Sequence, residues 1–337
     1  MIIEAWTHTL PWAVAFAREA RRMGAYPLVP YEDERAYWEA VDDGELDVLG
    51  TAAAHEWAAL SKANVYIHMW GPGDRVRLNA LPSAKSDRLF AFNSSWYQAA
   101  AKAKVRGARM ELGRPYPTLA RAYGVDQAKW TDQLVRATMV LPTAMERAAA
   151  PLARALGRGR TLRVRDAAGT DLTLGLARRP ALIAAGRPEV ANPRRPAGLL
   201  TGLPSGAVRV ALDETVAEGT IVSNRACYYD DGKATGGVFR FRAGKLTSAE
   251  FDRGGERFNA PFKTASKGRD RPGYFSIGLN PELRDTPQVE DVERGAVMVT
   301  VGGNRGFGGK NESNFFGWAI SAGASVEVDG RELSVRR

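Results

Sequence analysis

The hydrophobic pattern of the chain changes at Gly157, and this change limits the folds that the chain can adopt. Before it, apolar segments of strand length alternate with stretches in which apolar residues recur at helical spacing. After it, short segments of alternating character are separated by glycine-containing turns. Strand–helix–strand order is typical of a parallel sheet. The sequence therefore predicts an α/β domain with a parallel sheet over residues 1–156 and a β-rich domain over residues 157–337.

The same patterns predict the order of the individual elements. The first half begins with a strand at residues 1–9, a helix from Pro11 and a strand at residues 26–29. Further helices are expected over residues 32–40, 52–61, 85–103 and 127–156, the last partly interrupted at Pro142, and further strands over 64–70 and 108–112. In the second half we expect strands over residues 161–165, 172–176, 208–212, 220–223 and 238–242, followed by closing hairpins.

A glycine-rich segment lies near the C-terminus, from Gly295 to Ile320. It predicts a strand over residues 296–301, a loop over 302–309 and a second apolar segment over 315–320. Glycine lets the backbone take positive φ and approach a ligand or another chain closely. The loop does not open a helix after a strand, so it does not match a phosphate-binding fingerprint.

Composition and charge exclude several classes of protein. No apolar run reaches the ~20 residues of a membrane span, and no basic start of a signal peptide precedes the first apolar stretch, so we expect a cytoplasmic protein without a membrane partner. The net charge is +9, but acidic residues are interleaved with the basic ones and no nucleic-acid-binding motif is present, so a nucleic-acid partner is not indicated. The single cysteine, Cys227, is interpreted as a buried small hydrophobe.

The histidines do not form a recognisable ligand set. His8, His55 and His68 all lie in the first half of the chain, at wide spacing. We expect surface or capping roles for them, and no bound cofactor.

Several phrases of the chain occur in an order that matches one known family. They are ALPSAKSDRLF, YPTLARAYGVDQAKW, LRVRDAAGTDLTLGLARRP, LPSGAVRVALDETVAEGTIV, IGLNPEL and GGKNESNFFGW. Together they resemble the thermophilic aminopeptidase T family of leucyl aminopeptidases. The resemblance covers essentially the whole chain and implies the two-domain fold predicted above. It also implies a homodimer, because members of that family pair through their domains to enclose the active-site cavity.

The resemblance implies a metal centre whose ligands this chain lacks. Hydrolytic members hold two metal ions with two glutamates, two histidines and an aspartate. The matching positions here are Ala207, Tyr274, Met298, Phe315 and Gly317. None of these side chains is a competent ligand for a hard or borderline divalent cation, so the sequence predicts that the metal site is lost. An iron-dependent dioxygenase that opens 2,5-dihydroxypyridine resembles the chain in the same way and uses the same positions, so iron chemistry is also excluded as an analogy.

Other residues near these positions are candidates for a metal-free function. Tyr274, Asp213 and Glu214 are the candidate catalytic residues. Adjacent residues of a strand face opposite sides, so only one of the two acids can point inward. The candidate substrate-binding residues are Arg305, Lys310 and Asn311, which flank the glycine-rich loop and could hold an anion.

Three functions follow from this sequence. The first is a divergent aminopeptidase T-like protein that binds a small molecule or peptide in the inter-domain cleft without hydrolysis. The second is an active enzyme. It is either a metal-independent enzyme in the same pocket or a leucyl aminopeptidase-type hydrolase whose displaced ligands are drawn from Asp213, Glu214, Glu290, Asp291 and Glu293. The third is a structural or assembly role. Metal content and leucine release would separate the second from the others.

Overall fold

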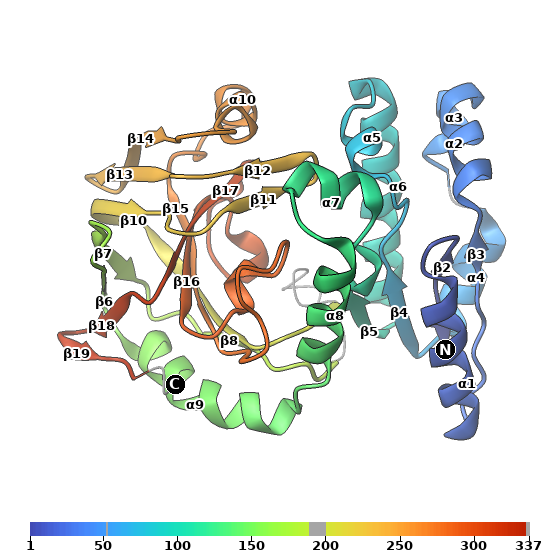
Figure 1. Cartoon of the computed structure of the whole chain (residues 1–337), viewed down its shortest axis with the longest axis horizontal. Coiled ribbons are helices and arrows are strands. Elements are labelled where there is room, and N and C mark those ends of the chain that lie inside the picture. Colours follow the sequence, from blue (N-terminus) through green and yellow to red (C-terminus); the bar gives the residue numbers. More distant parts are fainter. Residues whose placement is uncertain (52, 189–199, 335–337) are drawn as a thin grey trace. The chain divides into compact units, whose positions relative to one another are not determined.

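The computed structural model describes residues 1–51, 53–188 and 200–334 (Figure 1). Contacts divide the chain into two compact units, one of residues 1–131 with 188–203 and the other of residues 132–187 with 204–337. The predicted boundary between residues 156 and 157 lies inside the second unit. Helix α9 (Pro142–Arg158) belongs there because Leu152 and Leu156 pack in one hydrophobic core with the strands of the large sheet.

The first unit contains the parallel sheet that the sequence predicts. Its strand order is β1-β4-β5-β9, with all three pairings parallel. The strands are β1 (Ile2–Ile3), β4 (Val65–Met69), β5 (Arg106–Met110) and β9 (Leu200–Leu203). A short parallel pair is formed by β2 (Ala5–Trp6) and β3 (Tyr31–Glu32). The helices are α1 (Leu10–Arg22), α2 (Glu34–Asp43), α3 (Leu46–Leu49), α4 (Ala54–Lys62), α5 (Arg75–Asn79), α6 (Ser83–Lys102) and α7 (Pro117–Tyr123).

Local chemistry explains where these elements begin and where one expected strand fails. Helix α1 has a proline in its first turn, where no intrahelical hydrogen bond is lost, and α2 is capped by the Asp33 carboxylate, which accepts from two backbone N–H groups. The strand expected at residues 26–29 is reduced to a single bridge between Leu28 and Ile2, because Pro27 and Pro30 lack the N–H donors of a ladder. None of the described helices is long and apolar enough to cross a membrane.

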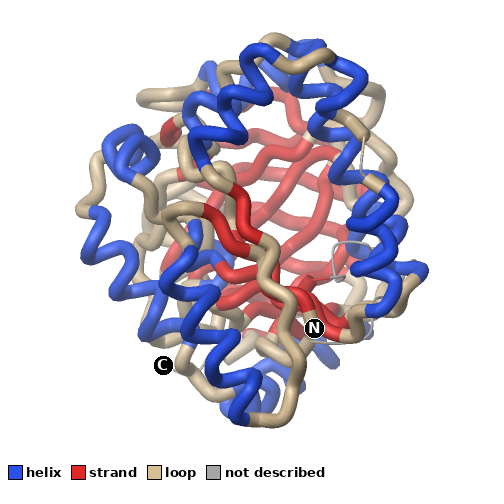
Figure 2. Tube along the Cα trace, turned by 90° about the vertical axis from the view of Figure 1, so that its right-hand side faces the viewer, coloured by secondary structure: helices blue, strands red, loops and turns tan. Residues whose placement is uncertain are grey.

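The second unit is built on an 11-stranded sheet, as expected for a β-rich half. Its main path runs β17-β16-β15-β10-β7-β6-β18-β19, and these strands lie side by side (Figure 2). They are β17 (Phe316–Ala322), β16 (Ala296–Gly302), β15 (Pro272–Gly278), β10 (Ala207–Val222), β7 (Asp171–Leu176), β6 (Thr161–Arg165), β18 (Ser325–Val328) and β19 (Arg331–Glu332). The other strands are β8 (Leu182–Ala184), β13 (Val238–Arg242), β14 (Lys245–Glu250) and the separate hairpin β11 (Cys227–Tyr229) with β12 (Gly232–Ala234).

Three expected elements have different extents in the structure. The strands predicted at residues 208–212 and 220–223 are parts of one strand, β10, whose pairing with β7 shifts between Leu212 and Ala217. The single helix predicted over residues 127–156 is two helices, α8 (Gln127–Thr138) and α9, since the residue before Pro142 is driven out of helical geometry.

The core of the second unit lies on one face of strands β15, β16 and β17. Phe275, Val297, Val299 and Ala319 point into it and are almost fully buried. Helix α10 (Glu256–Thr264) adds Phe258 to the same core. Because side chains alternate along a strand, the residues between these positions face the opposite side. That second face carries the candidate site.

Candidate functional site

An aromatic cluster occupies the second face of β15 and β17. It consists of Tyr274, Phe307, Phe316, Trp318 and Tyr229. The ring centroids are 4.1 Å apart for Tyr274–Phe307, 5.8 Å for Tyr274–Phe316, 5.5 Å for Phe316–Trp318 and 4.8 Å for Tyr229–Trp318. These separations lie within or close to the range in which aromatic rings attract one another. The five rings therefore form a continuous surface.

Strand register places this cluster beside Met298. Residue Met298 of β16 pairs with Ile320 of β17, and both pack with Tyr274. The Tyr274 hydroxyl donates to Met298 Sδ over 3.6 Å, and the Tyr274 backbone N–H donates to Thr300 Oγ1 over 2.7 Å. Thr300 in turn pairs with Trp318. Directly paired residues share a face, so Met298 and Trp318 lie on the side of Tyr274.

Exposure differs sharply across the aromatic cluster. Tyr274 is 5% exposed, whereas Phe316 is 45% exposed. Trp318 is half-buried, and its indole Nε1 is buried without a hydrogen-bond partner among the described residues. Leaving such a donor unsatisfied costs roughly 1–3 kcal/mol. The cluster therefore presents the Phe316 ring to solvent, beside a buried indole N–H that has no acceptor in the described part of the chain.

The glycine-rich loop brings Phe307 to the aromatic cluster. Its short 3₁₀ turn, η4 (Arg305–Phe307), follows Gly302, whose φ is +100°. A Cβ on Gly302 would lie 2.1 Å from the Phe315 carbonyl oxygen, so this close backbone approach requires glycine. The predicted role of glycine in this loop thus has a physical basis.

The Asn311 side chain forms hydrogen bonds with backbone groups of this loop and of the neighbouring Gly268. Its Nδ2 donates to the Gly268 and Gly302 carbonyls, both over 2.8 Å, and its Oδ1 accepts from the Ser313 N–H over 3.2 Å. The amide is thereby engaged in the loop itself. Asn311, predicted to bind substrate, therefore stabilises the loop through these hydrogen bonds.

The two cations predicted to bind substrate lie on the exposed side of the loop. The Arg305 guanidinium forms an ion pair with the Glu312 carboxylate. The Lys310 side chain is exposed, while its backbone N–H donates to Glu214 Oε1 over 2.7 Å. The charge of Arg305 is therefore balanced locally.

Of the predicted catalytic residues, Tyr274 alone lies in the aromatic cluster. The Glu214 carboxylate accepts two hydrogen bonds of 2.8 Å from Arg179 and one of 2.9 Å from Asn304 Nδ2. Partial burial raises the pKa of Glu214, but hydrogen bonds from Arg179, the Lys310 N–H and Asn304 outweigh it and lower the pKa to about 2. Such an ionised, fully engaged carboxylate is a poor proton acceptor.

Asp213 is also engaged locally. Its Oδ1 accepts from the Thr215 N–H over 2.9 Å and from the Thr215 hydroxyl over 2.5 Å. These contacts lie in the part of β10 where its pairing with β7 shifts. The structure does not bring Asp213 and Glu214 together with Tyr274 as an acid–base set among the described contacts.

Two of the predicted ligand positions face the core and not the aromatic cluster. Phe315 packs on Phe258 and Phe262, each at a centroid distance of 5.1 Å. A Cβ on Gly317 would meet the Phe258 ring at 2.3 Å. A metal centre needs all its ligands on one side of the sheet, so Phe315 and Gly317 cannot share a site with Tyr274 and Met298. Ala207, by contrast, alternates with the core residue Val208 and so faces the side of Tyr274.

Nearby acids do not supply a replacement ligand set. Glu290 Oε1 accepts from the Tyr228 N–H over 3.0 Å, Asp291 pairs with Arg209 over 2.7 Å, and Glu293 pairs with Arg225 over 3.1 Å. Across residues 1–51, 53–188 and 200–334, no group of three or more His, Cys, Asp or Glu side chains is placed to hold a metal ion. The residues present therefore do not fit the pair of metal ions that the family resemblance implies.

The histidines and the cysteine are likewise committed elsewhere. His8 and His68 lie in the first unit, where His8 Nε2 is 3.0 Å from the Gly113 carbonyl oxygen and His68 contacts Glu4. His55 is exposed. Cys227 is buried as predicted, and burial raises the pKa of its thiol to about 12. It is not poised as a nucleophile.

Comparison with known proteins identifies the family to which the chain belongs. A family model described as thermophilic metalloprotease (M29) matches residues 1–280, so the chain belongs to that family. Tyr229 and Tyr274 of the aromatic cluster lie within the matched residues, whereas Phe307, Phe316 and Trp318 lie beyond them. No curated protein matches the sequence.

Two solved structures share the fold at low sequence identity. Wild-type AmpT from Thermus thermophilus is 20% identical with a TM-score of 0.71, and the alignment covers 98% of this chain and 91% of AmpT. The 2,5-dihydroxypyridine dioxygenase from Pseudomonas putida KT2440 is 16% identical with a TM-score of 0.61, covering 98% of this chain and 88% of the dioxygenase. The predicted family and fold class are thus confirmed.

Tyr229, Phe307, Phe316 and Trp318 were not predicted as site residues. The available signal was the density of aromatic residues directly after the glycine-rich loop, together with strand alternation. Alternation alone does not say which of the adjacent Phe315 and Phe316 faces the core, and that choice decides the composition of the site.

Proposed function

We propose that this M29 family member binds a small molecule or peptide at the aromatic cluster and does not carry out two-metal hydrolysis. The observation that supports this most is the identity of the residues on the second face of β15, β16 and β17. Tyr274, Met298, Phe316 and Trp318 lie where a hydrolytic site would need carboxylates and imidazoles. None is a competent ligand for zinc, cobalt or manganese.

This proposal moves two of the family ligand positions by one residue. Phe316 and Trp318 take the places of the family's His-x-Asp, in preference to Phe315 and Gly317, because they share a face with Tyr274 and Met298. The proposed set of substituted positions is Ala207, Tyr274, Met298, Phe316 and Trp318.

The ligand that suits this surface carries an aromatic or flat apolar group and a hydrogen-bond acceptor. The apolar group would cover the exposed Phe316 ring. The acceptor would take the hydrogen bond from Trp318 Nε1 after a shift of the groups that bury this atom in the structure. Ring stacking contributes about 0.5–1.5 kcal/mol beyond the burial of area. A phenylalanine side chain followed by a peptide carbonyl has this combination.

The first test measures metal and hydrolysis together. Protein purified without chelators or an affinity tag is expected to contain far less than one metal ion per chain, and to release no leucine from a chromogenic substrate with added zinc, cobalt or manganese. Stoichiometric metal with turnover would refute the proposal and favour an enzyme with displaced ligands.

The second test measures binding at the aromatic cluster. Phenylacetamide, which has one ring and one carbonyl acceptor, is titrated into the protein and followed by saturation-transfer NMR. Phe316→Ala is expected to weaken binding roughly fivefold, as loss of about 1 kcal/mol of stacking implies. Phe90→Ala is the matched control, since Phe90 is an exposed phenylalanine of α6 in the other unit. Equal effects of the two substitutions would contradict a site at Phe316.

A third test checks the revised positions directly. A variant with Ala207→Glu, Tyr274→Glu, Met298→His, Phe316→His and Trp318→Asp is compared with one that carries Phe315→His and Gly317→Asp in place of the last two changes. Zinc binding is expected only for the first, because the second places polar groups against Phe258. Zinc binding by the second alone would restore the original assignment.

A further inference from the structure

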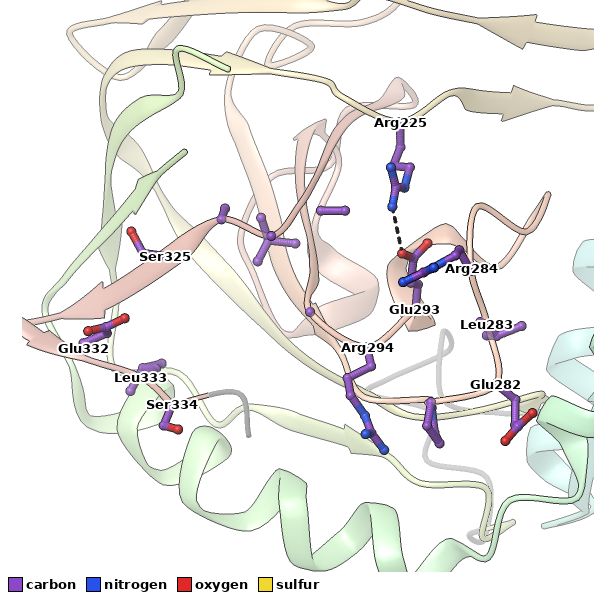
Figure 3. A pocket seen from close by; sticks show the side chains of 16 residues that line it. Arg225, Glu282, Leu283, Arg284, Glu293, Arg294, Ser325, Glu332, Leu333 and Ser334 are labelled. Atoms are coloured by element: carbon purple, nitrogen blue, oxygen red, sulfur yellow. Dashed lines mark hydrogen bonds and ion pairs between the residues drawn. The ribbon is translucent and has the colours of Figure 1, made fainter. Parts of the chain in front are cut away.

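A second pocket in the same unit lies away from the aromatic cluster. It has a volume of about 920 Å³ and is lined by the segment 281–284, by the start of β16, by the end of β17 and by residues 332–334 (Figure 3). No residue of the aromatic cluster lines it. It meets β16 at Val297, near the beginning of the strand, whereas the cluster contacts the strand at Met298 and Thr300.

The lining of this pocket includes three arginines, and two of them have no acidic partner among the residues that the structure describes. Arg225 Nη2 donates to Glu293 Oε1 over 3.1 Å, and the other oxygen of Glu293 accepts from the Asp285 N–H over 2.7 Å. The guanidinium groups of Arg284 and Arg294 form no hydrogen bond or ion pair with any part of the chain that the structure describes. Both side chains are exposed, so they are free to meet a ligand.

The carboxylates that line the pocket differ in whether another group already engages them. Glu293 is 6% exposed and fully used by Arg225 and Asp285. Glu282 is 3.6 Å from Arg136. Glu332 is the one lining carboxylate for which no partner is found within the described residues. It belongs to β19, on the far side of the pocket from Arg284 in Figure 3.

Arg225 adds a third guanidinium group to the lining of this pocket. Its side chain is 30% exposed, and the ion pair with Glu293 holds it in place. Three guanidinium groups in one lining favour an anionic group with several acceptor oxygens.

Apolar surface continues from this anion-binding end. A neighbouring pocket of about 650 Å³ runs along α9 past Ala148 and Leu152. The residues that it shares with the first pocket are Pro281, Arg294, Glu332, Leu333 and Ser334. A ligand with its charged group at Arg294 could therefore lay an apolar chain against α9. Burying such a chain contributes about 0.8 kcal/mol per CH₂.

We propose that these joined pockets bind an amphipathic anion, with a carboxylate or phosphate head at the end of the first pocket that Arg284 and Arg294 line and an apolar tail along α9. The two head groups share the same recognition by guanidinium groups. A carboxylate and a phosphate differ in charge, so a binding experiment that compares ligands with each head group distinguishes them.

Isothermal titration calorimetry with octanoate, octyl phosphate, inorganic phosphate and octylamine tests the proposal. Octanoate or octyl phosphate is expected to bind at least tenfold more tightly than inorganic phosphate or octylamine. A stronger signal from octyl phosphate assigns a phosphate head, and a stronger signal from octanoate assigns a carboxylate. Equal binding of octylamine and octanoate would overturn the proposal, since it would show an apolar groove without anion recognition.

Substitutions locate the head group. Arg294→Ala and Arg284→Ala are each expected to weaken binding of the preferred anion about tenfold, as loss of a charge-assisted hydrogen bond implies. Arg18→Ala removes an equally exposed arginine from α1 and is expected to change nothing. Phe316→Ala is likewise expected to leave this binding intact, which separates this pocket from the aromatic cluster. Unchanged affinity in both Arg284→Ala and Arg294→Ala, with unaltered melting temperatures, would refute the site.

Discussion

Replacing Glu214 with glutamine tests whether this carboxylate is a structural anchor of the glycine-rich loop. Glu214 joins Arg179 to two loop groups, Asn304 Nδ2 and the Lys310 N–H. Its pKa falls from the usual 4.5 to about 2, which at about 1.4 kcal/mol per pH unit sets a ceiling of about 3 kcal/mol on its contribution to stability. The side chain is 16% exposed, so solvent screening reduces this to roughly 2 kcal/mol.

The sign of the pH dependence follows from the lowered pKa. A group whose folded pKa is depressed stabilises the protein above its unfolded pKa and loses that stabilisation as the pH falls toward the folded value. The difference in unfolding free energy between the wild type and Glu214→Gln is therefore expected to be roughly 2 kcal/mol at pH 6. It should shrink as the pH falls from about 4.5 toward 2.

Urea unfolding at a series of pH values, followed by circular dichroism, measures this difference. Asp213→Asn is the neighbouring control, because Asp213 contacts only Thr215 in its own turn among the contacts found for it. It should lose less than half as much stability at pH 6. A wild-type-minus-Glu214→Gln difference that stays constant from pH 6 to pH 3 would refute the assignment of the lowered pKa to this network.

Three further outcomes are expected. Gly302→Ala should destabilise the protein by more than about 2 kcal/mol in urea unfolding, because its new Cβ would lie 2.1 Å from the Phe315 carbonyl oxygen. Gly308→Ala should cost about 1 kcal/mol, because Gly308 has positive φ but open space around it. Equal losses would contradict the steric argument. Cys227 should react with a thiol reagent only after unfolding, since its thiol is buried with a pKa of about 12, and rapid labelling of the native protein would argue against that burial. Light scattering should give twice the chain mass of 36.6 kDa, because the family resemblance implies a homodimer, and the mass of one chain would contradict this expectation.

The parts of the fold that depend on local pattern could be predicted from the sequence. Strand–helix–strand order gave the parallel sheet of the first unit, and alternating short segments gave the β-rich second unit. Strand β9 (Leu200–Leu203) was not predicted, although it completes the parallel sheet beside β5. Its partner lies about ninety residues earlier in the chain, and no local pattern encodes a pairing across that separation.

The site could be predicted only in part, for a related reason. Tyr274 and Met298 were identified from phrases with fixed spacing to the residues around them. Phe315 and Phe316 are chemically identical neighbours, and a shift of one residue exchanges the face on which each lies. Pairing of Gly302 with Phe316, and the closeness of Gly317 to Phe258, settle the register in a way that sequence alone does not.

The side chains at the substituted ligand positions provide an argument that the site binds a ligand. Retained glutamates or histidines without their metal ions would leave buried polar groups uncompensated, which is costly. Tyr274 and Met298 avoid that cost by packing together, so their contribution to the stability of the fold explains why both residues are present. Stability does not account for Phe316, which is 45% exposed, or for the buried Trp318 Nε1 without an acceptor. A ligand that covers the ring and accepts from the indole satisfies both groups at once, and this is the physical argument for a binding surface over a site that has merely lost its metal.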